Sequence, residues 1–183
     1  APLRRAGLLG AAAREHDVDA YYARLAEQGA HYGPAFRCIT EIRSEGRQVL
    51  GRVALPAGVA AAAPSFVLHP ALLDACLQLV GVGLSWGDTA PDGTPSDDLC
   101  VPVGMGNYRV HQSGLSQAWC HVSVDEATPD AEAVGADVTL FDNHGVVVAE
   151  VRRLVLKRVT RALLQRAMAG NAPAAEWAFE ADW

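Results

Sequence analysis

The sequence predicts an α+β fold in which one long central helix is wrapped by a curled antiparallel sheet. The first observation is a near-continuous apolar segment at residues 69–84, whose apolar positions cover almost the whole circumference of a helix. A helix that is apolar on all sides has to be buried on all sides. The second observation is the order of the elements, which is helix, two strands, buried helix and four strands. One sheet curled around the buried helix satisfies both observations.

The elements before the central helix are a short helix and a β-hairpin. Residues 17–28 have apolar side chains at helical spacing, and Gly29 is expected to end this helix. Residues 36–43 and 48–55 flank a polar turn, and the second segment places alternate apolar residues on one face. This pattern predicts two paired antiparallel strands.

The central helix is expected to begin at His69, because Pro70 suits the first helical position, where its missing N–H would have no partner. Four strand-like segments follow, at residues 101–111, 117–126, 136–142 and 146–157. A short basic helix at 160–169 and an Ala/Pro-rich linker come last. The helix-and-sheet arrangement is the hot-dog fold. We expect a linker at 1–16, a hot-dog domain at 17–158, and a C-terminal helix and linker at 159–183.

Composition excludes several classes of function. The chain has 183 residues and a net charge of −6, which argues against a nucleic-acid-binding protein, since phosphate groups need a basic surface. No apolar run reaches the ~18–20 residues of a membrane span. The cysteines are too widely spaced for a zinc site or a disulfide framework. They are Cys38, Cys76, Cys100 and Cys120. Free thiols indicate a cytoplasmic protein.

Asp74 is the one charged residue of the central helix. An acidic side chain is rarely buried without a partner, and Gln78 lies one turn further along the same face, where its amide can hydrogen-bond the carboxyl group. Ala71 and Gly81 continue this face with small side chains, which leaves room for a substrate. A carboxyl group among apolar atoms keeps its proton more readily, which suits a general acid. The alternative is an aspartate at a helix end that opens to solvent.

Two motifs resemble those of dehydratase domains in modular polyketide synthases. Residues 69–78, HPALLDACLQ, resemble the HPALLDxxxQ/H motif of that family, and residues 31–36, HYGPAF, resemble its YGPxF motif. Further similar segments are residues 19–25, 101–103, 142–150 and 179–183. The resemblance spans nearly the whole chain. It implies one half of a double hot dog that removes water from 3-hydroxyacyl thioesters held on an acyl carrier protein, with syn or anti stereochemistry.

The resemblance also implies roles for individual residues. Asp74 would protonate the departing hydroxyl group, because hydroxide is a poor leaving group. Gln78 would orient Asp74, and Tyr32 would hydrogen-bond near the hydroxyl group or the acid. Gly33 and Pro34 would shape the loop through which the substrate approaches. The substrate would be carried on the phosphopantetheine arm of the carrier protein, and neither a metal nor a bound organic cofactor is implied.

The general base of this family, a histidine in an HxxxGxxxxP motif, is absent. Four residues after the six histidines stand Ala20, Ala35, Leu73, Leu115, Asp125 and Val148, none of which is glycine. His69 and Pro70 belong to the aspartate motif and are candidate substrate-binding residues, although His69 is expected to cap the helix. The chain therefore resembles the C-terminal, aspartate-bearing half, and a piece of a longer polypeptide is expected.

Three hypotheses for the function remain open. The first is half an enzyme, inactive alone, which an N-terminal histidine-bearing hot dog completes. The second is a non-catalytic docking or structural module that keeps the fold. The third is a self-paired single hot dog, a homodimer that binds acyl thioesters or hydrolyses them. A buried acid with a matched partner favours the first hypothesis, because a purely structural module has no packing reason to keep them.

Overall fold

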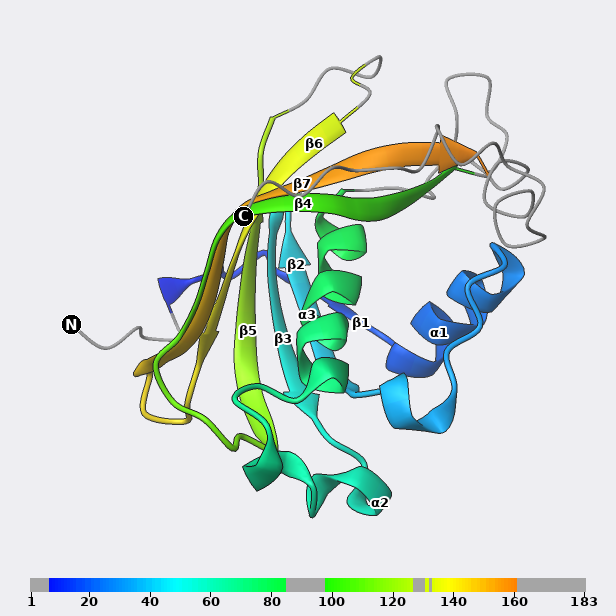
Figure 1. Ribbon diagram of the computed structural model, residues 1–183. Coiled ribbons are helices and arrows are strands. Elements are labelled where there is room, and N and C mark those ends of the chain that lie inside the picture. The colour runs from blue at the N-terminus through cyan, green and yellow to red at the C-terminus, as the bar shows by residue number, and fades with distance from the viewer. Residues whose placement is uncertain (1–6, 85–97, 127–130, 132, 161–183) are drawn as a thin grey trace.

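A computed structural model describes residues 7–84, 98–126, 131 and 133–160. A seven-stranded sheet curls around the helix α3, with the helix α1 on its open side (Figure 1). The first half of the chain forms β1 (Arg14–His16), α1 (Val18–Glu27), η2 (Pro34–Phe36), β2 (Ile39–Glu45), β3 (Gln48–Ala54), α2 (Ala57–Ala60) and η3 (Ala63–Ser65). Then come α3 (Pro70–Gly83), β4 (Asp98–Val110), β5 (Gln117–Val124), β6 (Ala133–Phe141) and β7 (Val147–Thr160).

The sheet is antiparallel throughout, and its strand order is β1-β2-β3-β5-β6-β7-β4. Strands β2 and β3 form the predicted hairpin, and the tight turn between them contains Gly46 at a φ of 56°. The long strands β4 and β7 pair along their length and complete the curl of the sheet. The α+β arrangement of a central helix inside a curled antiparallel sheet, predicted from the sequence, is confirmed.

Helix α3 is capped at its N-terminus and packed against the inner face of the sheet. His69 caps its N-terminus, as predicted, by accepting a hydrogen bond from the backbone N–H of Ala71 at 3.2 Å. The helix packs against β2, β3, β5 and β6. Gly51 on β3 lies against Leu79 so closely that it has room for no side chain. The helix residues that are fully shielded from solvent are Leu72, Ala75, Cys76, Leu79 and Val80.

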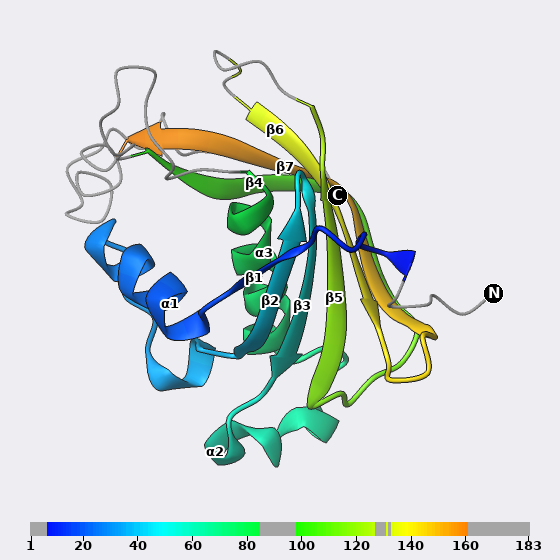
Figure 2. The ribbon, with the colours of Figure 1, turned by 180° about the vertical axis from the view of Figure 1, so that it is seen from behind.

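The N-terminal segment crosses the outer side of the sheet (Figure 2). Leu8 and Leu9 pack there against Leu50, Trp119 and Phe141, which form a second, smaller apolar cluster. The segment then enters the sheet as the edge strand β1. Residues 14–16, expected within a linker, are therefore part of the sheet, whereas the proposed domain boundaries stay a prediction.

Three further expectations concern the C-terminal helix, the cysteines and membrane spans. Thr160 is the last residue of β7, and the rest of the basic helix expected at 160–169 lies outside the described residues. Within the described residues, none of the four cysteines forms a disulfide, and three of them are buried. Within the described parts of the chain, none of the helices is long and apolar enough to span a membrane.

Candidate active site

Asp74 and Gln78 lie side by side on one face of α3. The side-chain Nε2 of Gln78 donates a hydrogen bond to Oδ2 of Asp74 at 2.6 Å. Gln78 is buried, with 6% of its surface exposed, whereas Asp74 is partly buried in the wall of a pocket. Asp74 is therefore neither fully exposed nor outside a helix. The pairing expected from the four-residue spacing is confirmed.

The Gln78 amide has three hydrogen bonds rather than one. Its Nε2 also donates to the backbone carbonyl of Phe36 at 3.1 Å, and its Oε1 accepts from the hydroxyl of Tyr22 at 3.0 Å. The neighbouring Tyr21 donates its hydroxyl to the backbone carbonyl of Gln78 at 2.6 Å. Both tyrosines come from α1, which Asp17 caps by accepting from the N–H of Ala20. Helix α1 thus holds the residue that pairs with the acid.

Sequence reasoning did not identify Tyr22 as part of the site. The sequence placed both Tyr21 and Tyr22 only within the helix expected at 17–28 and the similar segment at 19–25. Adjacent helical residues point about 100° apart, so Tyr21 and Tyr22 can both be buried only if the buried stripe of α1 is wide enough to include both. The available signal was a pair of large side chains, each with a polar tip that needs a partner when buried.

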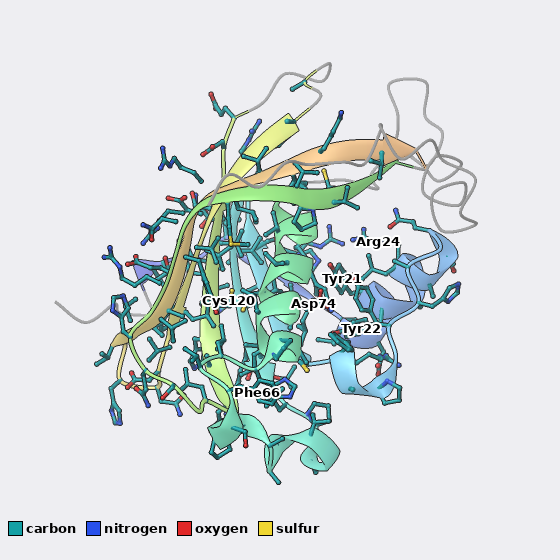
Figure 3. The ribbon with its side chains drawn as sticks, in the orientation of Figure 1. Tyr21, Tyr22, Arg24, Phe66, Asp74 and Cys120 are labelled. Atoms are coloured by element: carbon teal, nitrogen blue, oxygen red, sulfur yellow. The ribbon has the colours of Figure 1, made fainter. Side chains whose placement is uncertain are left out.

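Asp74, Gln78 and Tyr32 line the same pocket, which has a volume of about 250 Å³. Figure 3 shows Asp74 on α3 facing α1, which carries Tyr21, Tyr22 and Arg24. The Tyr32 ring lies edge-on to the Tyr22 ring with 6.1 Å between centroids. The apolar walls include Leu25, Leu77, Val101 and Leu156, and the polar lining includes Arg24 and Gln28.

The phenols of the site are hydrogen-bond donors at neutral pH. Burial raises the pKa of Tyr22 to about 12. Burial also raises the pKa of Tyr32, and the nearby charge of Asp74 adds to the effect. No histidine lines the pocket among the described residues, and no three of their His, Cys, Asp or Glu side chains gather as a metal-binding group. The described lining can therefore donate protons and hydrogen bonds but contains no imidazole.

The four remaining candidates are not among the residues that line this pocket. Gly33 and Pro34 are exposed at the start of η2, and a methyl group added at Gly33 would meet no heavy atom within 4 Å. His69 and Pro70 begin α3, where the His69 ring packs edge-on against Phe66 with 4.6 Å between centroids. The structure thus brings together Asp74, Gln78 and Tyr32 only, and substrate binding by the other four stays a prediction.

Comparisons with known proteins agree with this fold. Residues 1–166 match the family model described as "Polyketide synthase dehydratase N-terminal domain". Mycoketide-CoA synthase of Mycobacterium tuberculosis is 34% identical over 167 residues, which is 91% of this chain and 4% of that protein. Polyketide synthase GfsA of Streptomyces halstedii is 32% identical over 147 residues, which is 79% of this chain and 2% of that protein.

Solved structures of dehydratase domains share the fold. GphF dehydratase 1 is 32% identical with a TM-score of 0.69, and the match covers 84% of this chain and 54% of that one. The dehydratase domain from the CurK module of the curacin polyketide synthase is 28% identical with a TM-score of 0.69, over 82% of this chain and 50% of that one. The chain spans about half the length of these domains and a few per cent of the synthases. By its sequence motifs, its hot-dog fold and these matches, the chain belongs to the polyketide synthase dehydratase family.

Proposed function

We propose that this chain is the aspartate-bearing half of a polyketide synthase dehydratase, a hydro-lyase that removes water from 3-hydroxyacyl thioesters on an acyl carrier protein. The observation that carries the proposal is the hydrogen bond from Gln78 Nε2 to Asp74 Oδ2, 2.6 Å long, in the wall of a pocket that Tyr32 also lines. A partly buried acid with a dedicated amide partner suits proton donation and gives the fold no packing advantage.

The assignment to the C-terminal half rests on which catalytic motif the chain carries. The matching family model is described as an N-terminal domain, yet the chain has the aspartate motif and lacks the HxxxGxxxxP motif of the histidine half. Two solved CurK dehydratase variants are described as inactive, one with an aspartate replaced by asparagine and one with a histidine replaced by phenylalanine. We infer that Asp74 corresponds to such an aspartate, and that the histidine comes from a second hot dog.

The proposed reaction needs one acid and one base. The base removes the α-proton of the thioester, and the electron pair of that C–H bond forms the Cα–Cβ double bond. The Cβ–O bond breaks with its electrons on oxygen, and Asp74 supplies the proton that lets this oxygen leave as water. Asp74 becomes a carboxylate, which the N–H of Gln78 stabilises through a hydrogen bond to a charged group. An acid and a base suffice, so the reaction requires no organic cofactor.

The other site residues have supporting roles in this proposal. Tyr32 donates a hydrogen bond to the substrate hydroxyl or to the acid, for which its raised pKa keeps it protonated. Gly33 and Pro34 shape the loop that follows Tyr32. His69 and Pro70, at the start of the aspartate motif, contact the substrate. The carrier protein delivers the substrate on its phosphopantetheine arm.

The edge strand β4 supports the need for a second hot dog. Within the described residues it pairs only with β7, and its other edge is open. Met105 and Tyr108 on this strand are 44% and 43% exposed, unusual for large apolar and aromatic side chains in a sheet. We propose that a histidine-bearing hot dog, or a second copy of this chain in its absence, covers this edge.

Complementation in trans tests the proposed function. The 183-residue chain, incubated with a 3-hydroxyacyl group on an acyl carrier protein, should form no more unsaturated product than the carrier alone. Addition of a histidine-bearing dehydratase half should start turnover. Mass spectrometry would follow it as the loss of one water molecule from the carrier-bound acyl group. Turnover by the chain alone would contradict the half-enzyme proposal. Thioester hydrolysis in place of dehydration would favour the self-paired thioesterase instead.

A further inference from the structure

We propose that Tyr22 is a positioning residue for the acid: it fixes the orientation of the Gln78 amide and so determines which oxygen of Asp74 carries the proton. Tyr22 is 6% exposed and is not among the residues that line the pocket. It therefore acts through Gln78 and not by contact with substrate. The part of this inference that concerns catalysis rests on the proposed function, whereas the orientation of the amide does not.

The direction of the hydrogen bonds begins at a backbone N–H. The N–H of Ile39 donates to the hydroxyl oxygen of Tyr22 at 3.3 Å, and a backbone amide can only donate. The Tyr22 oxygen is thus an acceptor towards Ile39, and its own proton is directed to Oε1 of Gln78 at 3.0 Å. Since the phenol stays protonated at all ordinary pH values, this donor is permanent.

The Gln78 amide then has one arrangement that satisfies all its partners. Its Nε2 faces Oδ2 of Asp74 and the carbonyl oxygen of Phe36, both acceptors. A rotated amide would turn its own oxygen towards these two oxygens and its N–H groups towards the Tyr22 hydroxyl. That exchange loses two hydrogen bonds and brings acceptors together in a buried place, where an unsatisfied polar group is costly. Among the described residues, the Tyr22 hydroxyl donates the hydrogen bond that keeps Oε1 of Gln78 turned away from Asp74.

The amide orientation has a consequence at the acid. In a neutral carboxyl group the carbonyl oxygen is the better acceptor, so the hydrogen bond from Gln78 to Oδ2 of Asp74 favours the proton on Oδ1. The acid then presents its proton from one defined oxygen. After proton transfer, the same N–H stabilises the carboxylate. An amide free to rotate would offer its carbonyl oxygen to the carboxyl proton for part of the time and withdraw that proton from the substrate.

Hydrogen exchange of the Gln78 side-chain amide, followed by NMR in the 183-residue chain, tests the orientation directly. Tyr22→Phe should accelerate this exchange roughly tenfold, the factor of one net hydrogen bond. Tyr21→Phe is the matched control, because it removes an equally buried hydroxyl that bonds the backbone carbonyl of Gln78 and not the amide. It should leave the side-chain exchange at the wild-type rate. Unchanged exchange in Tyr22→Phe, or equal acceleration in Tyr21→Phe, would overturn the inference.

A double-mutant cycle in the complex with a histidine-bearing half tests the consequence for catalysis. Tyr22→Phe should lower kcat about tenfold with KM unchanged, and should lower it no further in a Gln78→Ala background. Additive losses would show that Tyr22 acts by another route and would overturn its positioning role. If the wild-type complex forms no unsaturated product at all, the proposed function fails, and the amide exchange still decides whether Tyr22 orients Gln78.

Discussion

Gln78 hydrogen-bonds Asp74 from one turn further along α3, with 2.6 Å between Nε2 and Oδ2. The amide is itself held by Tyr22 and by the carbonyl of Phe36, so three separate segments of the chain meet at this contact. The acid is therefore oriented by the fold, and a change at the amide should affect both stability and rate.

Gln78→Ala should lower the rate of the complete dehydratase, but by less than any loss of the acid itself. The substitution removes the group that orients Asp74 and leaves the carboxyl proton in place. It should also lower the free energy of unfolding by about 1–3 kcal/mol, because the Tyr22 hydroxyl and the Phe36 carbonyl lose a buried partner. Denaturant unfolding and steady-state rates measure the two effects. A rate below that of the Asp74→Asn variant would contradict the assigned roles.

Gly51→Ala should destabilise the fold by about 1–3 kcal/mol, the usual cost of overpacking a core. A Cβ atom at Gly51 would overlap Cδ1 of Leu79 and lie 2.8 Å from its Cδ2 and 3.1 Å from the Glu41 carbonyl oxygen. Gly104→Ala is the control, since a Cβ atom on that strand position meets nothing within 4 Å. Equal midpoints of denaturation for the two variants would show that the helix does not pack as described.

The sequence predicted the central helix, its cap at His69 and six of the seven strands, because apolar periodicity and turn residues are local signals. It also predicted the pairing of Asp74 with Gln78, which follows from helical spacing alone. The role of Tyr22 could not be read in this way, since its partner lies 56 residues away. The same holds for β1, whose three residues form a strand only because β2 offers a free edge.

The candidate residues identified by their motifs differ in whether they line the pocket. Tyr32 was also identified by its motif, and it lines the pocket; η2, which follows it in the sequence, contacts α3. Gly33, Pro34, His69 and Pro70 were identified by motif membership, and a motif fixes proximity in sequence rather than position in a pocket.

His121 should make the fold less stable as the pH falls below neutral. Burial lowers the pKa of its imidazole, and the charge of Arg152 lowers it further. The unfolded chain therefore binds a proton more readily than the folded chain, so stability falls as pH drops through about 6.5, the ordinary pKa of histidine. Unfolding free energies at pH 7 and pH 5 should differ less in His121→Gln than in the wild type.

Strand β4 should mediate self-association of the isolated chain. Its open edge and the exposed side chains of Met105 and Tyr108 offer a template for another sheet. Light scattering should show a dimer or larger assembly, which Met105→Lys weakens. Val67→Lys is the control, because Val67 is 65% exposed but lies outside the sheet. A stable monomer at high concentration would count against an uncovered partner surface on β4.

Asp74→Asn, in the complex with a histidine-bearing half, tests the role of the acid. The amide keeps the shape of the side chain but has no carboxyl proton, so dehydration of a carrier-bound 3-hydroxyacyl group should fall by roughly 10²–10⁴-fold. The circular dichroism spectrum should stay that of the wild type, and Glu41→Gln, an exposed carboxylate on β2 paired with Arg52, should keep the wild-type rate. Mass spectrometry of the carrier-bound product measures the loss of water. Full activity in the Asp74→Asn complex would contradict the central claim.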